Sequence, residues 1–138
     1  MTSSQEYIEK LRKSGLRPTK QRINICEVLF NRLDTFHFTI NDLVKTIESN
    51  SKEKISLATV YNTIHAFEKK GYLKEIAINS NQTYFDTNIS SHHHFFDEVE
   101  KKLIDLEEQD VHPIKIKKSI PGKKIKSVEV LVKIGLDK

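Results

Sequence analysis

The sequence predicts a mixed α+β protein in which helices come first and strands follow. Apolar residues recur at helical spacing in four segments before residue 71, and they alternate with polar residues in the segments after it. The charge balance also changes, because residues 1–76 carry 13 Lys and Arg against 9 Asp and Glu, whereas residues 77–138 carry 10 of each. We therefore expect two small lobes, residues 1–86 and residues 87–138.

Two helices are expected at the start of the chain. Tyr7, Ile8 and Leu11 share one face of the first helix, and Ser14 with Gly15 ends it. Thr19 can cap the second helix, which has a wide apolar stripe. The stripe consists of Ile23, Cys26, Leu29, Phe30 and Leu33. Because the single cysteine of the chain lies in this stripe, we expect a buried thiol without a functional role.

Capping residues also mark two further helices. Thr39 and Asp42 form a capping box for a short third helix, and Ser56 can cap a fourth that ends at Gly71. The apolar face of the third helix consists of Ile40, Leu43, Val44 and Ile47. That of the fourth consists of Leu57, Val60, Ile64 and Phe67. The residues of the fourth helix expected to face outward are Ala58, Thr59, Tyr61, Asn62 and His65.

A two-stranded hairpin is expected after the fourth helix. Residues 72–79 alternate, residues 79–81 form a turn, and residues 83–85 begin the returning strand. The third and fourth helices alone would also fit a plain helical hairpin. With the strands added, the arrangement is a winged helix-turn-helix, whose second helix enters the major groove of DNA.

Basic residues gather where such a domain would meet phosphates. Seven Lys and Arg residues and one acid, Glu27, lie between residues 10 and 32. A solvated basic face is the alternative interpretation. The residues expected to contact DNA are Arg17, Thr19, Lys20, Arg22, Ala58, Thr59, Tyr61 and Asn62.

The second lobe is expected to be a small α/β unit. Residues 103–106 predict one strand, and residues 126–134 alternate strongly and predict another. Two strands are not stable alone. We therefore expect a second copy of the chain to complete the core, which makes this the dimerisation lobe of a homodimer.

Three adjacent histidines lie within an acidic stretch of this lobe. If residues 92–94 are extended, His92 and His94 project to one face and His93 to the other. Closure of the two lobes could join them with His37, Asp86 and Asp105 into a set of five N and O ligands that suits Fe(II), Mn(II) or Zn(II). A surface histidine run without a metal is the alternative. One cysteine cannot form a four-cysteine zinc site.

The chain resembles the ferric uptake regulator family over roughly residues 8 to 106. Four blocks in this order carry the resemblance. They are residues 16–22 (LRPTKQR), 56–63 (SLATVYNT), 83–88 (TYFDTN) and 92–96 (HHHFF). Within the family, the match is closest to the iron response regulator of alphaproteobacteria.

The resemblance implies a homodimeric transcription regulator that binds A/T-rich double-stranded operators near iron and haem genes. Members of the family bind the regulatory metal between their lobes. The positions that fall there are His37, Asp86, His92, His94 and Asp105. His93 and His112 fall near a second, incomplete family metal position. Tyr61 matches the tyrosine of the family's recognition helix, and Asn62 replaces a common arginine.

Two departures from the family pattern affect the function that we expect. Asp97 and Glu100 stand where most members have the first cysteine pair of a structural zinc site, and a Cys-Pro haem motif is absent. The subfamily links its histidine triplet to haem, so His92, His93, His94 and His112 are candidate haem or second-metal ligands. This favours an iron- or haem-responsive regulator.

Other functions fit parts of the sequence. The alternative within the family is an Fe(II)- or Mn(II)-dependent repressor or a peroxide sensor, which has the same five ligands. A metal-dependent hydrolase would need a substrate cleft and a positioned acid or base, and the sequence has a recognition helix instead of a nucleophile motif, so we do not expect an enzyme. An architectural DNA-binding protein would leave the histidines unexplained. No apolar run approaches the length of a membrane span, and the N-terminal residues lack the apolar stretch of a signal peptide, so we expect the chain to stay in the cytoplasm.

Overall fold

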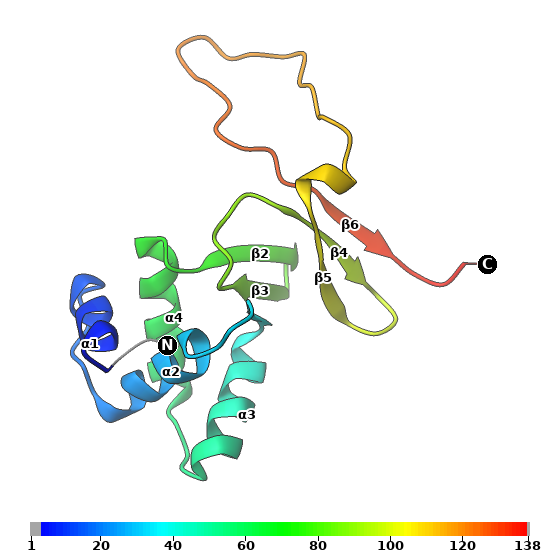
Figure 1. The fold of residues 1–138 in the computed structure, drawn as a ribbon. Coiled ribbons are helices and arrows are strands. Elements are labelled where there is room, and N and C mark those ends of the chain that lie inside the picture. The colour runs from blue at the N-terminus through cyan, green and yellow to red at the C-terminus, as the bar shows by residue number, and fades with distance from the viewer. Residues whose placement is uncertain (1–3, 138) are drawn as a thin grey trace. The chain divides into compact units, whose positions relative to one another are not determined.

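A computed structural model describes residues 4–137 of the chain, which divide between Ile89 and Ser90 into two compact units, called unit 1 and unit 2 below (Figure 1). The elements of unit 1 are α1 (Ser4–Lys13), α2 (Lys20–Phe30), β1 (His37–Phe38), α3 (Ile40–Ser51), α4 (Leu57–Lys70), β2 (Lys74–Asn79) and β3 (Gln82–Asp86). Those of unit 2 are β4 (His93–Asp97), β5 (Lys102–Leu106), the one-turn 3-10 helix η1 (Glu108–Asp110) and β6 (Leu131–Ile134). The predicted α+β class, with a winged helix-turn-helix and a small second lobe, is confirmed.

Helix α2 is central to unit 1, because it packs against α1, α3 and α4. Each predicted cap is present. Thr19 accepts a hydrogen bond from the Arg22 N–H, and Ser56 accepts one from the Thr59 N–H. The capping box of α3 is complete, with both hydrogen bonds at 3.1 Å. These caps satisfy backbone donors that the first turn of a helix leaves unpaired, so they fix where α2, α3 and α4 begin.

The helices differ from the prediction at three places, two in their apolar faces and one in helix length. Leu33 is exposed, because α2 ends at Phe30. Leu57 is also exposed, since it occupies the first turn of α4, and the buried positions are Val60, Thr63, Ile64 and Phe67. Helix α3 extends to Ser51 through polar residues and ends where Lys52 adopts a left-handed conformation. Helical spacing alone does not identify the solvated end turn of a helix.

The wing of unit 1 has a third strand that the sequence did not predict. The order of its sheet is β1-β3-β2, and β3 is antiparallel to both neighbours. In the β1–β3 register, His37 pairs with Asp86 and Phe38 pairs with Phe85. Two further hydrogen bonds between Phe36 and Thr87 extend this pairing. The short strand thus brings two residues that are far apart in sequence side by side.

Unit 2 is built on a sheet with the order β5-β4-β6. Strand β4 is antiparallel to β5 and parallel to β6. Of the predicted strand over residues 126–134, the paired part is Leu131–Ile134, which lies beside His94 to Asp97 of β4. The residues between η1 and β6 form a long loop, drawn in orange in Figure 1. Among the described residues, no helix has the length and apolar character needed to cross a membrane.

The single thiol of the chain lies in the core of unit 1, as predicted. Cys26 is fully buried on α2, and this burial raises the pKa of its thiol from 9.0 to about 12. The thiol is therefore protonated throughout the physiological pH range, and the protonated form is a weak nucleophile. We expect the native protein not to react with Ellman's reagent at pH 8, and the urea-unfolded protein to react fully. Rapid reaction of the native protein would contradict this burial.

Candidate metal ligands and DNA-binding surface

His37 and Asp86 form the first candidate ligand group, which lies in unit 1. The cross-strand register places them opposite each other, and His37 Nε2 lies 3.1 Å from Asp86 Oδ2. The other carboxylate oxygen of Asp86 accepts a hydrogen bond of 2.8 Å from the Asn88 N–H. Asp86 is fully buried, and a buried carboxylate is stable only when hydrogen bonds and positive charge compensate it.

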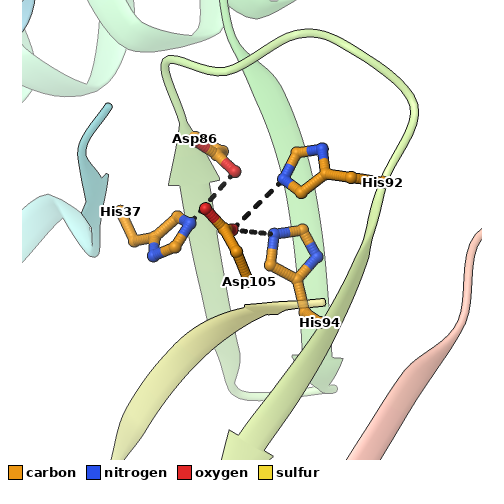
Figure 2. A group of neighbouring side chains, drawn as sticks. All are labelled: His37, Asp86, His92, His94 and Asp105. Atoms are coloured by element: carbon orange, nitrogen blue, oxygen red, sulfur yellow. Dashed lines mark ion pairs between the residues drawn. The ribbon is translucent and has the colours of Figure 1, made fainter. Parts of the chain in front are cut away.

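The second group, which lies in unit 2, consists of His92, His94 and Asp105. His94 and Asp105 are opposite each other in the β4–β5 register, and His92 precedes His94 by two positions on the same face. Asp105 Oδ1 lies 3.3 Å from the Nε2 atoms of both histidines. Figure 2 draws both groups and shows the two rings directed at the Asp105 carboxylate.

Backbone contacts orient the rings of unit 2. The Nδ1 of His92 lies 2.7 Å from the Ser90 carbonyl oxygen, to which it can donate its proton. A proton on Nδ1 leaves the lone pair on Nε2, the nitrogen that faces Asp105 and that can coordinate a metal. His93 faces the other way, and its Nδ1 accepts a 2.9 Å hydrogen bond from the Val130 N–H. The predicted alternation of the triplet is confirmed.

The donor atoms of both groups suit a divalent metal. Each of the five side chains offers one nitrogen or carboxylate oxygen. Two ligands about 2.1 Å from one ion are about 3.0 Å apart at a right angle and about 3.4 Å apart at a tetrahedral angle. The separations of 3.1 Å within the first group and 3.3 Å within the second fall in this range. Mixed imidazole and carboxylate donors suit iron, manganese and zinc.

The remaining candidate ligands, His93 and His112, line one hollow of unit 2. Its volume is about 510 Å³, and Glu108 and Lys126 also line it. His93 is buried, whereas His112 is exposed. His93 therefore shares this hollow with His112 and does not face the Asp105 carboxylate.

Most of the predicted DNA-contacting residues of α4 are accessible. Ala58, Tyr61 and Asn62 are exposed, and Thr59 is half-buried in the first turn. The sequence also predicted an outward His65, which is wrong in part. The His65 ring is half-buried and lies between Tyr61 and Phe85.

The basic residues that were predicted to contact DNA differ in their exposure. Arg17 and Lys20 are exposed, and Lys20 lies 3.6 Å from Glu53 in a solvent-exposed ion pair. Arg22 is half-buried and donates a 3.0 Å hydrogen bond to the Arg17 carbonyl oxygen, so it also supports the loop before α2. Thr19 accepts the hydrogen bond that caps α2.

The polar turn of the wing lines a hollow beside α4. A hollow of about 540 Å³ lies within unit 1 and is lined by residues of α3, α4 and the β2–β3 hairpin. Ser80, Asn81 and Gln82 line it opposite Tyr61 and His65. Their position beside α4 depends on the fold and does not follow from the local sequence.

Comparison with known proteins agrees with these features. The sequence model of the ferric uptake regulator family matches residues 13–134 of this chain. The peroxide operon regulator of Bacillus subtilis (strain 168) is 35% identical over 101 residues, which cover 73% of this chain and 68% of that protein. The peroxide-responsive repressor PerR of Staphylococcus aureus (strain Mu50 / ATCC 700699) is 30% identical over 110 residues, or 80% of this chain and 72% of that protein.

Solved structures show the same fold. The ferric uptake regulator from Pseudomonas aeruginosa, solved with manganese, superimposes with a TM-score of 0.67 at 19% identity and covers 96% of this chain and 98% of that one. The sequence matches and the shared fold lead to one conclusion. The chain belongs to the ferric uptake regulator family, whose members are metal-responsive, DNA-binding transcription regulators and not enzymes.

Proposed function

We propose that this chain is a cytoplasmic, homodimeric repressor whose operator binding depends on a divalent metal and is lost when peroxide oxidises the metal site. The observation that carries the proposal is the presence of two ligand groups with matching chemistry, His37 with Asp86 and His92 with His94 and Asp105. Together they offer three imidazole nitrogens and two carboxylates, a set that suits Fe(II) and Mn(II).

One ion would take ligands from both groups. Because the groups belong to different compact units, such an ion would restrain the DNA-binding unit relative to unit 2. A metal that binds this restrained state more tightly shifts the population toward it. By linkage, operator DNA would then raise the metal affinity by the same factor as the metal raises the DNA affinity.

The relatives support peroxide as the signal. The two proteins compared above are a peroxide operon regulator and a peroxide-responsive repressor. Bound Fe(II) would supply the reaction with hydrogen peroxide that adds oxygen to a ligand histidine, whereas Mn(II) would not. The chain's own contribution is to hold the imidazole rings beside the carboxylates, with His92 and His94 buried.

A haem-responsive regulator, which the sequence favoured, is less well supported. His92, His93 and His94 are at most 6% exposed, and their ring nitrogens contact Asp105, Ser90 or the Val130 N–H. Haem ligation would have to break these contacts and open the sheet. The two sequence relatives named above are a peroxide operon regulator and a peroxide-responsive repressor, so we propose peroxide in place of haem.

Unit 2 supports the homodimer. Its sheet is small, and isoleucines are exposed on β5 and on the loop before β6. These are Ile104, Ile114, Ile116, Ile120 and Ile125. Ile116, Ile120 and Ile125 line one hollow, and a contiguous exposed apolar patch is typical of a surface that another protein covers. We propose that a second copy covers them.

Selection of DNA from a random pool tests the function. The full chain with Mn(II) should recover an A/T-rich, two-fold symmetric sequence, because a homodimer presents two recognition helices to two half-sites. The same selection with EDTA, or with the His37→Ala variant, should recover no consensus. An identical consensus with EDTA would contradict metal dependence, and no consensus under any condition would contradict operator binding.

A further inference from the structure

We propose that His65 is a positioning residue that holds Tyr61 in the orientation with which it reads operator DNA. The proposal rests on the DNA-binding function proposed above and deepens it. It assigns part of the sequence discrimination to a side chain that is not itself presented to DNA. Three observations on unit 1 carry it, namely the contact with Tyr61, the support from Phe85 and the burial of His65 Nε2.

The first observation is the contact on the surface of α4. Tyr61 and His65 are one helical turn apart, so their side chains lie on the same face. Their ring centroids are 4.3 Å apart, and the ring planes are tilted by 47°. Tyr61 is 52% exposed and would otherwise sample several rotamers. A side chain that is already held in its bound rotamer loses less entropy on binding.

The second observation is the support behind His65. Its ring meets the Phe85 ring edge-on, with centroids 6.1 Å apart and planes at 88°. Phe85 is buried on β3 and stacks on Phe38 of β1 at 5.8 Å. A continuous row of rings therefore runs from the exposed Tyr61 into the core. The sheet supplies a fixed base against which His65 can hold Tyr61.

The third observation concerns how His65 is itself held. Its Nε2 is buried and makes no hydrogen bond to any residue that the structure describes. This nitrogen therefore does not fix the ring, and the contacts with Tyr61 and Phe85 do. A positioning role of this kind needs a flat ring more than it needs a hydrogen-bonding group. It follows that Phe should replace His65 and that a non-aromatic residue should not.

The location explains why the orientation of Tyr61 would affect sequence reading. Tyr61 and His65 both line the hollow between α4 and the wing, opposite Ser80, Asn81 and Gln82. A Tyr61 ring that rotated away from His65 could enter this hollow and leave the outer face of α4. Base edges and the thymine methyl group would then lose a contact.

The test is a comparison of variants of the full chain with Mn(II), using the duplex that the wild-type protein selects and a scrambled duplex of the same composition. The ratio of the two affinities measures discrimination. We expect His65→Ala and Tyr61→Ala each to lower this ratio about ten-fold. The double variant should lower it no further, because both substitutions remove the same contact, that of Tyr61 with DNA. His65→Phe should keep the ratio within about two-fold of the wild type.

Each outcome decides between explanations. If Tyr61→Ala loses discrimination and His65→Ala keeps it, the positioning role is wrong while operator binding stands. If His65→Ala weakens binding to both duplexes equally, His65 is only structural. If the wild type does not discriminate, the proposed function fails as well. If His65→Ala does not fold, His65→Gln takes its place. A lower affinity ratio in His65→Gln but not in His65→Phe supports the positioning role, and equal ratios in these two variants overturn it.

Discussion

Replacing Asp105 with Ala is expected to weaken Mn(II) binding by about 100-fold or more. One carboxylate oxygen of this residue lies 3.3 Å from the Nε2 atoms of both His92 and His94, so it is central to its ligand group. Without it, this ligand group loses its carboxylate and keeps only the two imidazoles. Isothermal titration of Mn(II) into the full, metal-free chain measures the change.

Glu98→Ala is the matched control for this prediction. Glu98 is an exposed acid in the turn between β4 and β5, and its removal changes the net charge by the same amount. We expect Glu98→Ala to bind Mn(II) within about two-fold of the wild type, because an exposed charge is screened by solvent. An equal loss in both variants would show that general negative charge attracts the metal, which would contradict a site at Asp105.

Hydrogen peroxide is expected to add one oxygen atom, about 16 Da, to a histidine of the Fe(II)-loaded chain. The candidates are the three histidines of the ligand groups, His37, His92 and His94. Peptide mass spectrometry locates the change. With Mn(II) in place of Fe(II), the same histidines should remain unmodified after the same treatment.

The internal controls for this experiment are histidines outside the ligand groups and the single thiol. His65 lies beside Tyr61, and His112 lies on the exposed rim of another hollow, so neither should gain oxygen. Cys26 should also remain unmodified, because its thiol is buried and protonated. Oxygen on Cys26 or on all histidines alike would contradict oxidation directed by a bound metal.

The sequence predicted those parts of the protein that depend on local patterns. Capping residues and apolar spacing identified all four helices, and the turn at residues 79–81 identified the hairpin. Strand alternation divided the histidine triplet correctly, since His93 faces away from Asp105. These features depend on neighbours within a few residues, which is why one sequence is enough to find them.

Features that depend on long-range contacts were not predictable in the same way. Strand β1 has two residues, too few to show alternation, and it forms only because β3 pairs with it. The contact between His65 and Phe85 joins α4 to β3 through the fold. The spacing of Leu57 predicted a core residue, but its side chain is exposed at the start of α4. The sequence also suggested haem as the signal, whereas the relatives compared above are a peroxide operon regulator and a peroxide-responsive repressor.

The most direct test of metal-dependent, peroxide-sensitive repression is operator affinity measured on one preparation in four states: metal-free, with Mn(II), with Fe(II), and with Fe(II) after peroxide. We predict weak binding without metal, tight binding with either metal, and loss of tight binding only after peroxide treatment of the Fe(II) form. Equal affinity in all four states would contradict the proposed function.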